Sequence, residues 1–249
     1  MGCGRTCGGA VTSMPEQLFD PRTLLVTAPV FLFSLSLHEF MHAWTANRLG
    51  DPTARLAGRL TVNPIAHYDL FGTTLGLLVR VFGWAKPVPV NEAAFRRPKR
   101  DMMLTALGGP ATNLALALCF GVVFKVVQAF DPATLGRAPG LAELVEKMAG
   151  YGVYLNLALA VFNLIPLHPL DGHHILRGFL SFRGALAYDR MKRFSSYLLM
   201  FLILFSFLGL GPPILSIVIF RPMFFIMRLG FTTPEYNRLV DVVGPLLRI

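Results

Sequence analysis

Long stretches without a charged residue constrain this chain more than any other feature. Residues 102–124, 148–170 and 194–220 contain no Asp, Glu, Lys or Arg, and residues 23–37 form a fourth, shorter apolar run. An apolar run of about 18 or more residues can cross the hydrocarbon core of a bilayer as a helix. Charged residues make up only 15% of the 249 residues, against about 25% in a typical soluble domain. The pattern predicts an all-α polytopic membrane protein with about four to six transmembrane helices.

The expected spans follow these apolar runs. The first covers about residues 24–44, the second 103–127 and the third 149–167. The last apolar stretch, 194–227, is interrupted at 209–213, so it forms either one kinked span with an interfacial tail or two short spans with Arg221 near one end. Residues 70–81 are apolar but too short to cross, which favours a re-entrant or interfacial hairpin. The prolines of residues 83–91 exclude a helix there and allow an extended segment.

The sequence therefore divides into three parts. A flexible, glycine-rich N-terminal head at 1–22 contains Cys3 and Cys7, the membrane-embedded core covers 23–193, and C-terminal hydrophobic helices and a tail cover 194–249.

The distribution of Lys and Arg predicts the orientation of the spans. The head has two such residues, the loop after the first expected span has nine, the next loop has three, and the segment after the third span has five. Because cytoplasmic loops carry the excess of Lys and Arg, the N-terminus is predicted outside, and the C-terminal ends of the first and third spans face the cytoplasm. This bias also accounts for the net charge of +9 without a nucleic-acid partner.

The end of the first expected span carries the motif H-E-x-x-H at residues 38–42. Helical spacing places His38 and His42 one turn apart on the same face, where both imidazoles can bind one Zn²⁺. Glu39 can then reach a metal-bound water and act as general base. Ionisable residues in an apolar helix are costly and tend to be functional, so the motif predicts a zinc site.

A catalytic zinc requires a third protein ligand and one open position. Asp171 directly follows the third expected span and is predicted on the same side of the membrane as the two histidines, with Gly172 removing bulk beside the metal. A helix cap is the alternative role for Asp171. At most one of three neighbouring histidines could replace it as ligand, and a local turn contact explains a fourth histidine, in an earlier loop, better than metal binding does. These histidines are His168, His173 and His174, and in the earlier loop His67.

Several motifs in this order resemble the site-2 protease family of intramembrane zinc metalloproteases, in its compact prokaryotic branch without a PDZ domain. They are H-E-F-M-H at 38–42, G-P-A-T-N-L at 109–114, and N-L-I-P through L-D-G at 163–172, with two further segments at 58–64 and 83–91. The resemblance covers about residues 32–178 and is more specific than any single motif.

The resemblance implies one Zn²⁺ per chain, bound by His38, His42 and Asp171, with Glu39 as the catalytic acid/base. It also implies supporting roles near the site for two asparagines within the second and third spans. For each of them an oxyanion donor and an interhelical hydrogen bond are both open. These residues are Asn113 and Asn163.

The expected function is cleavage of a transmembrane or near-membrane segment of another membrane protein, in the membrane of a prokaryotic cell and with the site toward the cytoplasm. A helical substrate must unwind first, and residues 83–91 offer an edge that could pair with it. The expected partners are such a substrate and the lipid bilayer, and the sequence leaves the oligomeric state open. Two alternatives are a zinc or ion transporter, which has no need of Glu39, and an inactive membrane scaffold.

Overall fold

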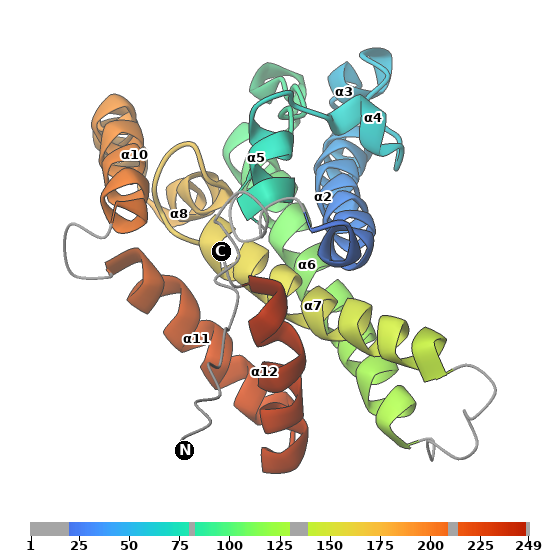
Figure 1. Ribbon diagram of the computed structural model, residues 1–249. Helices are drawn as coiled ribbons and strands as arrows, with labels where there is room; N and C mark the ends of the chain where they lie inside the picture. Colours follow the sequence, from blue (N-terminus) through green and yellow to red (C-terminus); the bar gives the residue numbers. More distant parts are fainter. Residues whose placement is uncertain (1–19, 80–82, 130–138, 209–213, 248–249) are drawn as a thin grey trace, which may run out of the picture.

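The structure is a computed structural model that describes residues 20–79, 83–129, 139–208 and 214–247, and within these ranges every regular element is a helix (Figure 1). Three long helices form the centre. They are α2 (Pro21–Leu49), α6 (Pro98–Ala129) and α7 (Pro139–Asn163). The helical class predicted from the apolar runs is thus confirmed, and Cys3 and Cys7 lie outside the described residues.

The helix α7 lies at the middle of the molecule (Figure 1) and is buried on all sides over residues 149–160. Its neighbours are α2, α6, α11 (Ile214–Gly230) and α12 (Thr233–Leu247). Gly152 permits the close approach of α6, because the ring of Phe120 occupies the place where a Cβ would lie, at 2.4 Å. A helix that is apolar on all sides is buried among other helices. The C-terminal helices α11 and α12 cover the part of α7 that α2 and α6 leave open.

The helix α2 has a defined start and a defined end. It begins after Asp20, whose carboxylate accepts hydrogen bonds from the backbone N–H groups of Arg22 and Thr23 at 3.2 and 3.1 Å. It ends before Gly50, which has a φ of 110°, a conformation that glycine adopts readily. The helix is longer than the span predicted over 24–44. His42 therefore lies about two turns before the helix end, and not at the end as the sequence suggested.

Short elements connect α2 to α6. These are α3 (Thr53–Leu56), α4 (Pro64–His67), α5 (Gly72–Val79) and the 3₁₀ turn η1 (Glu92–Ala94). Within the hairpin predicted over 70–81, residues 72–79 form the helix α5. The chain folds back along this helix, since the backbone N–H of Trp84 donates to the carbonyl of Gly72 at 3.3 Å, and the re-entrant or interfacial placement stays a prediction. Residues 83–91 form neither helix nor strand, as their prolines predict.

After α7 the chain turns through residues 164–170 into α8 (Asp171–Phe179), α9 (Phe182–Arg190) and α10 (Lys192–Phe207). The predicted third span corresponds to α7, which begins ten residues earlier and ends four residues earlier than expected. The last apolar stretch forms the two helices α10 and α11, and its interruption at 209–213 lies outside the described residues. Arg221 lies in the middle of α11 and not near one end.

Two helices of the described residues, α2 and α6, are long and apolar enough to cross a membrane, with mean hydropathies of 1.6 and 1.8. Only 28% of the apolar window of α6 is buried inside the protein. Leu118 and Val122, for example, are 73% and 62% exposed on this helix. The number of membrane spans stays a prediction.

Candidate metal centre

Three side chains from two distant segments meet beside α6. The Nε2 atoms of His38 and His42 are 3.0 Å apart, and they lie 3.3 and 3.4 Å from the two carboxylate oxygens of Asp171. Tetrahedral zinc with bonds of about 2.0–2.1 Å separates its ligand atoms by about 3.3 Å. The three donors therefore have the spacing of a zinc site, and within the described ranges they are the one group of three or more such side chains that could hold a metal.

The outer nitrogen of each imidazole determines which atom faces this cluster. His42 Nδ1 lies 2.8 Å from the carbonyl oxygen of Thr105, which can only accept, so Nδ1 carries the hydrogen. His38 Nδ1 lies 2.5 Å from Asn113 Oδ1. Both Nε2 atoms therefore direct lone pairs at each other and at the carboxylate of Asp171. Such an arrangement calls for a cation at its centre.

The state of Asp171 agrees with a cation site. Its Oδ2 atom is buried and has no hydrogen-bond donor. Buried charged oxygens without donors are rare in folded proteins unless they coordinate an ion. The donor set of two imidazoles and one carboxylate fits zinc.

The structure does not show Asp171 as a helix cap. It is the first residue of α8, and the capping position is taken by Leu170, which makes no side-chain cap bond. A Cβ at Gly172 would lie only 2.3–2.4 Å from the carbonyl oxygens of Ile165 and Leu164. Gly172 therefore permits close packing of α8 against the turn after α7, and the sequence-based explanation that it removes bulk beside the metal is wrong.

Glu39 lies next to His38 and is held by the extended segment 83–91. Its Oε2 atom accepts a hydrogen bond from the backbone N–H of Val88 at 3.2 Å. The segment is thus fixed beside the candidate base, a contact that sequence reasoning did not foresee. Two further backbone bonds anchor it: Lys86 N–H donates to the carbonyl of His67 at 2.9 Å, and Asn91 N–H donates to the buried carboxylate of Asp51 at 2.7 Å.

The two predicted supporting asparagines differ in position. Asn113 is fully buried and bridges His38 and Asn156, so it makes an interhelical hydrogen bond. Asn163 instead donates to the carbonyl of Leu159 one turn earlier in α7, at 3.0 Å. Sequence reasoning missed Asn156, although an amide in the middle of an apolar run was a usable signal.

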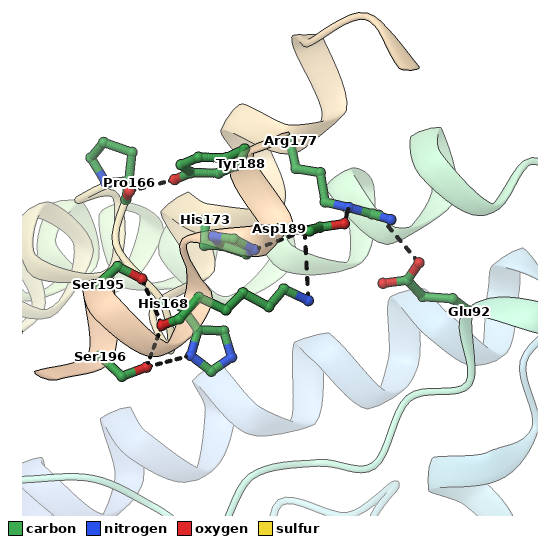
Figure 2. A network of polar contacts seen from close by, with 10 residues as sticks. Glu92, Pro166, His168, His173, Arg177, Tyr188, Asp189, Ser195 and Ser196 are labelled. Atoms are coloured by element: carbon green, nitrogen blue, oxygen red, sulfur yellow. Dashed lines mark hydrogen bonds and ion pairs between the residues drawn. The ribbon is translucent and has the colours of Figure 1, made fainter. Parts of the chain in front are cut away.

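Beyond Asp171, a polar network ties α8 to its surroundings (Figure 2). The guanidinium of Arg177 donates to Asp189 at 2.9 Å and to Glu92 at 3.2 Å. Lys192 lies 3.6 Å from the same Asp189 carboxylate. Because Glu92 directly follows the extended segment 83–91, these ion pairs connect the helix that bears Asp171 to the segment that holds Glu39.

The remaining histidines do not join the metal cluster. His173 faces Asp189 at 3.4 Å, and His168 contacts the hydroxyl of Ser196 at 2.9 Å (Figure 2). Burial is the main effect that lowers the pKa of His173 and of His174 to about 4, so both imidazoles are neutral at pH 7. The last, His67, lies 2.8 Å from the carbonyl of Thr61, which is the local contact predicted for it.

A helical protein that presents H-E-x-x-H on one helix and a carboxylate from another is a metallopeptidase by its donor set and base. The family model for Peptidase family M50 matches residues 132–206. A Bacillus subtilis protein named "Putative zinc metalloprotease YwhC" is 38% identical over 195 residues, which cover 77% of this chain and 85% of that protein. "Putative zinc metalloprotease Rip2" of Mycobacterium tuberculosis is 32% identical over 210 residues, which cover 79% and 75%.

The chain therefore belongs to peptidase family M50, the site-2 protease family that its motifs resemble, and it is a zinc metallopeptidase. No solved structure matches the chain significantly.

Proposed function

We propose that this protein is an intramembrane endopeptidase that cuts a transmembrane or near-membrane segment of another membrane protein. The observation that carries the proposal is the convergence of His38, His42 and Asp171 beside apolar helices, with the two histidines only 5% and 8% exposed. The largely unburied apolar window of α6 supports a bilayer around the site. The setting we propose is a prokaryotic cell membrane, with the site toward the cytoplasm.

In this proposal His38, His42 and Asp171 hold one Zn²⁺ per chain. When bound, zinc activates water and polarises the carbonyl of the scissile peptide bond. Glu39 takes the proton of the attacking water and passes it to the leaving amine. The Val88 N–H holds Oε2 of Glu39, so Oε1 is the oxygen that moves the proton.

The extended segment 83–91 is the part of the protein that we propose to receive the substrate. A helical substrate hides its peptide bonds inside its own hydrogen bonds, so it has to unwind before cleavage. The segment runs past Glu39, and its Pro87 and Pro89 are exposed. Main-chain pairing with an unwound substrate would place a peptide bond beside the proposed base, and cleavage of this kind would serve regulated intramembrane proteolysis.

The proposed ligand set is tested by Asp171→Asn. Wild-type protein purified without chelator is expected to contain about one zinc per chain. The asparagine keeps the size of the side chain but removes the charge that compensates the metal, so we expect at least about tenfold weaker zinc binding and loss of cleavage. Chelator competition and elemental analysis measure the first effect, and a cleavage assay measures the second.

The control for this experiment is Asp241→Asn, which changes an exposed carboxylate in α12 and should leave zinc unchanged. Helical content by circular dichroism should be the same in both variants, because neither carboxylate caps a helix and asparagine keeps the size of the side chain. Normal zinc affinity in Asp171→Asn would overturn the assignment and direct attention to the neighbouring His168, His173 and His174.

The membrane proposal makes a separate topological prediction. Reporter fusions at Arg97, before α6, and at Arg190, at the end of α9, should both report the cytoplasm, whereas a fusion at the N-terminus should report the outside. The physical reason is the excess of Lys and Arg in the two segments that carry these residues. Fusions at Arg97 and Arg190 that report opposite sides would contradict a shared site for the two halves of the ligand set.

A further inference from the structure

We propose that Asn156 is a positioning residue for the metal centre, and that it sets the tautomer of His38 through a directed hydrogen-bond relay. The relay runs from the backbone carbonyl of Gly152 through Asn156 and Asn113 to His38. The proposal rests on the proposed role of His38 as a zinc ligand. It assigns a function to a residue of α7 that touches neither the metal donors nor Glu39.

The relay is buried and connects three helices. The side chains of Ser34 in α2, Asn113 in α6 and Asn156 in α7 are all 0% exposed. Asn156 Nδ2 lies 2.9 Å from both the carbonyl oxygen of Gly152 and the hydroxyl of Ser34. Asn113 Nδ2 lies 2.8 Å from Asn156 Oδ1, and Asn113 Oδ1 lies 2.5 Å from His38 Nδ1.

The direction of the relay follows from its fixed end. A backbone carbonyl can only accept, so Asn156 must turn its NH₂ group toward Gly152. Its Oδ1 then faces Asn113, which must present its own NH₂ group there. Asn113 Oδ1 is thereby turned toward His38, and His38 Nδ1 must carry the hydrogen. The lone pair of His38 is left on Nε2, the atom that faces His42 and Asp171.

The second histidine reaches the same state in one step, because His42 Nδ1 donates directly to the carbonyl of Thr105. Each of the two histidines is therefore connected to a backbone carbonyl, His42 directly and His38 through the amides of Asn113 and Asn156. The surroundings of Asn156 are apolar, since its neighbours over residues 149–160 belong to the buried core. In such a medium no solvent can replace a lost member of the relay, so the orientation of Asn113 depends on Asn156.

The test compares zinc affinity in four proteins: wild type, Asn156→Leu, Asn113→Asp and the double variant. Asn156→Leu frees the amide of Asn113 to rotate, and we expect about tenfold to hundredfold weaker zinc binding. Asn113→Asp places two acceptor oxygens face to face, at residues 113 and 156, and should also weaken binding. In the double variant that conflict is gone. Both oxygens of the carboxylate at position 113 can accept from His38 Nδ1, so its orientation no longer depends on residue 156, and the zinc affinity should return to within a few-fold of wild type.

If Asn156 only filled space in the core, the double variant would not recover its zinc affinity. If the two substitutions weaken zinc binding by independent factors that multiply in the double variant, or if Asn156→Leu binds zinc like wild type, the relay is overturned. Asn156→Ser also removes the amide that bonds Asn113, and it replaces the leucine variant if that variant does not fold. Ser36→Ala is the matched control, because its buried hydroxyl bonds only the Leu32 carbonyl in its own helix, at 2.6 Å. Absence of zinc from wild type would instead contradict the proposed function.

Discussion

Glu39→Gln is expected to abolish peptide cleavage while leaving the zinc content of the protein unchanged. Glutamine has nearly the same shape, and its Oε1 atom can still accept the Val88 N–H that the structure places on Glu39. It cannot take up a proton from water. General acid–base catalysis contributes about 10²- to 10⁴-fold to a rate, so we expect a loss of at least that size. Single-turnover cleavage and elemental analysis of the same sample measure both quantities.

The same variant separates the protease from its alternatives. The matched control is Glu143→Gln, which changes a side chain that is 61% exposed in α7 and should cleave normally. A zinc or ion transporter that used His38, His42 and Asp171 as a transit site would keep its flux in Glu39→Gln. Cleavage that survives in Glu39→Gln at the wild-type rate would remove Glu39 from the mechanism.

Gly109→Ala is expected to eliminate zinc binding, although glycine has no group that could bind a metal. A Cβ at this position would lie 2.4 Å from His42 Nε2 and 2.6 Å from His38 Nε2. Neither imidazole can move aside without breaking its bond to Thr105 or Asn113. The added methyl group therefore displaces the donor atoms. Loss of a hydrogen-bond partner of a metal ligand typically weakens metal binding by about 10- to 100-fold, and we expect at least about hundredfold weaker zinc binding here.

The control is Gly121→Ala in the same helix, where a Cβ would lie 3.3 Å from the tip of the Phe231 ring and far from the donors. Both variants lengthen α6 side chains by one methyl group and raise helix propensity equally. Zinc affinity measured by chelator competition should fall in Gly109→Ala alone. Equal zinc affinity in the two variants would show that the close approach of α6 to the histidines is not as the structure has it.

Local physical chemistry determined much of this protein in advance. Apolar runs without charges specify buried or lipid-facing helices, and the helical period alone places His38 and His42 on one face. Pro87 and Pro89 exclude a helix from the segment beside Glu39. These features depend on residues close together in the chain, so they could be derived from the sequence. The choice of Asp171 required more, namely the charge distribution that put two segments on one side.

Contacts between distant residues were decided by the packing of α2, α6 and α7. Asn113 and His38 are 75 residues apart, and Val88 and Glu39 are 49 apart, so no periodicity relates them. The same holds for Gly109, whose position against the imidazoles depends on how closely α6 approaches α2. A sequence motif names the donors of a metal site. Which tautomer those donors adopt, which backbone N–H holds the base and which residue must stay small follow only when interdigitating helices bring their partners within hydrogen-bond distance.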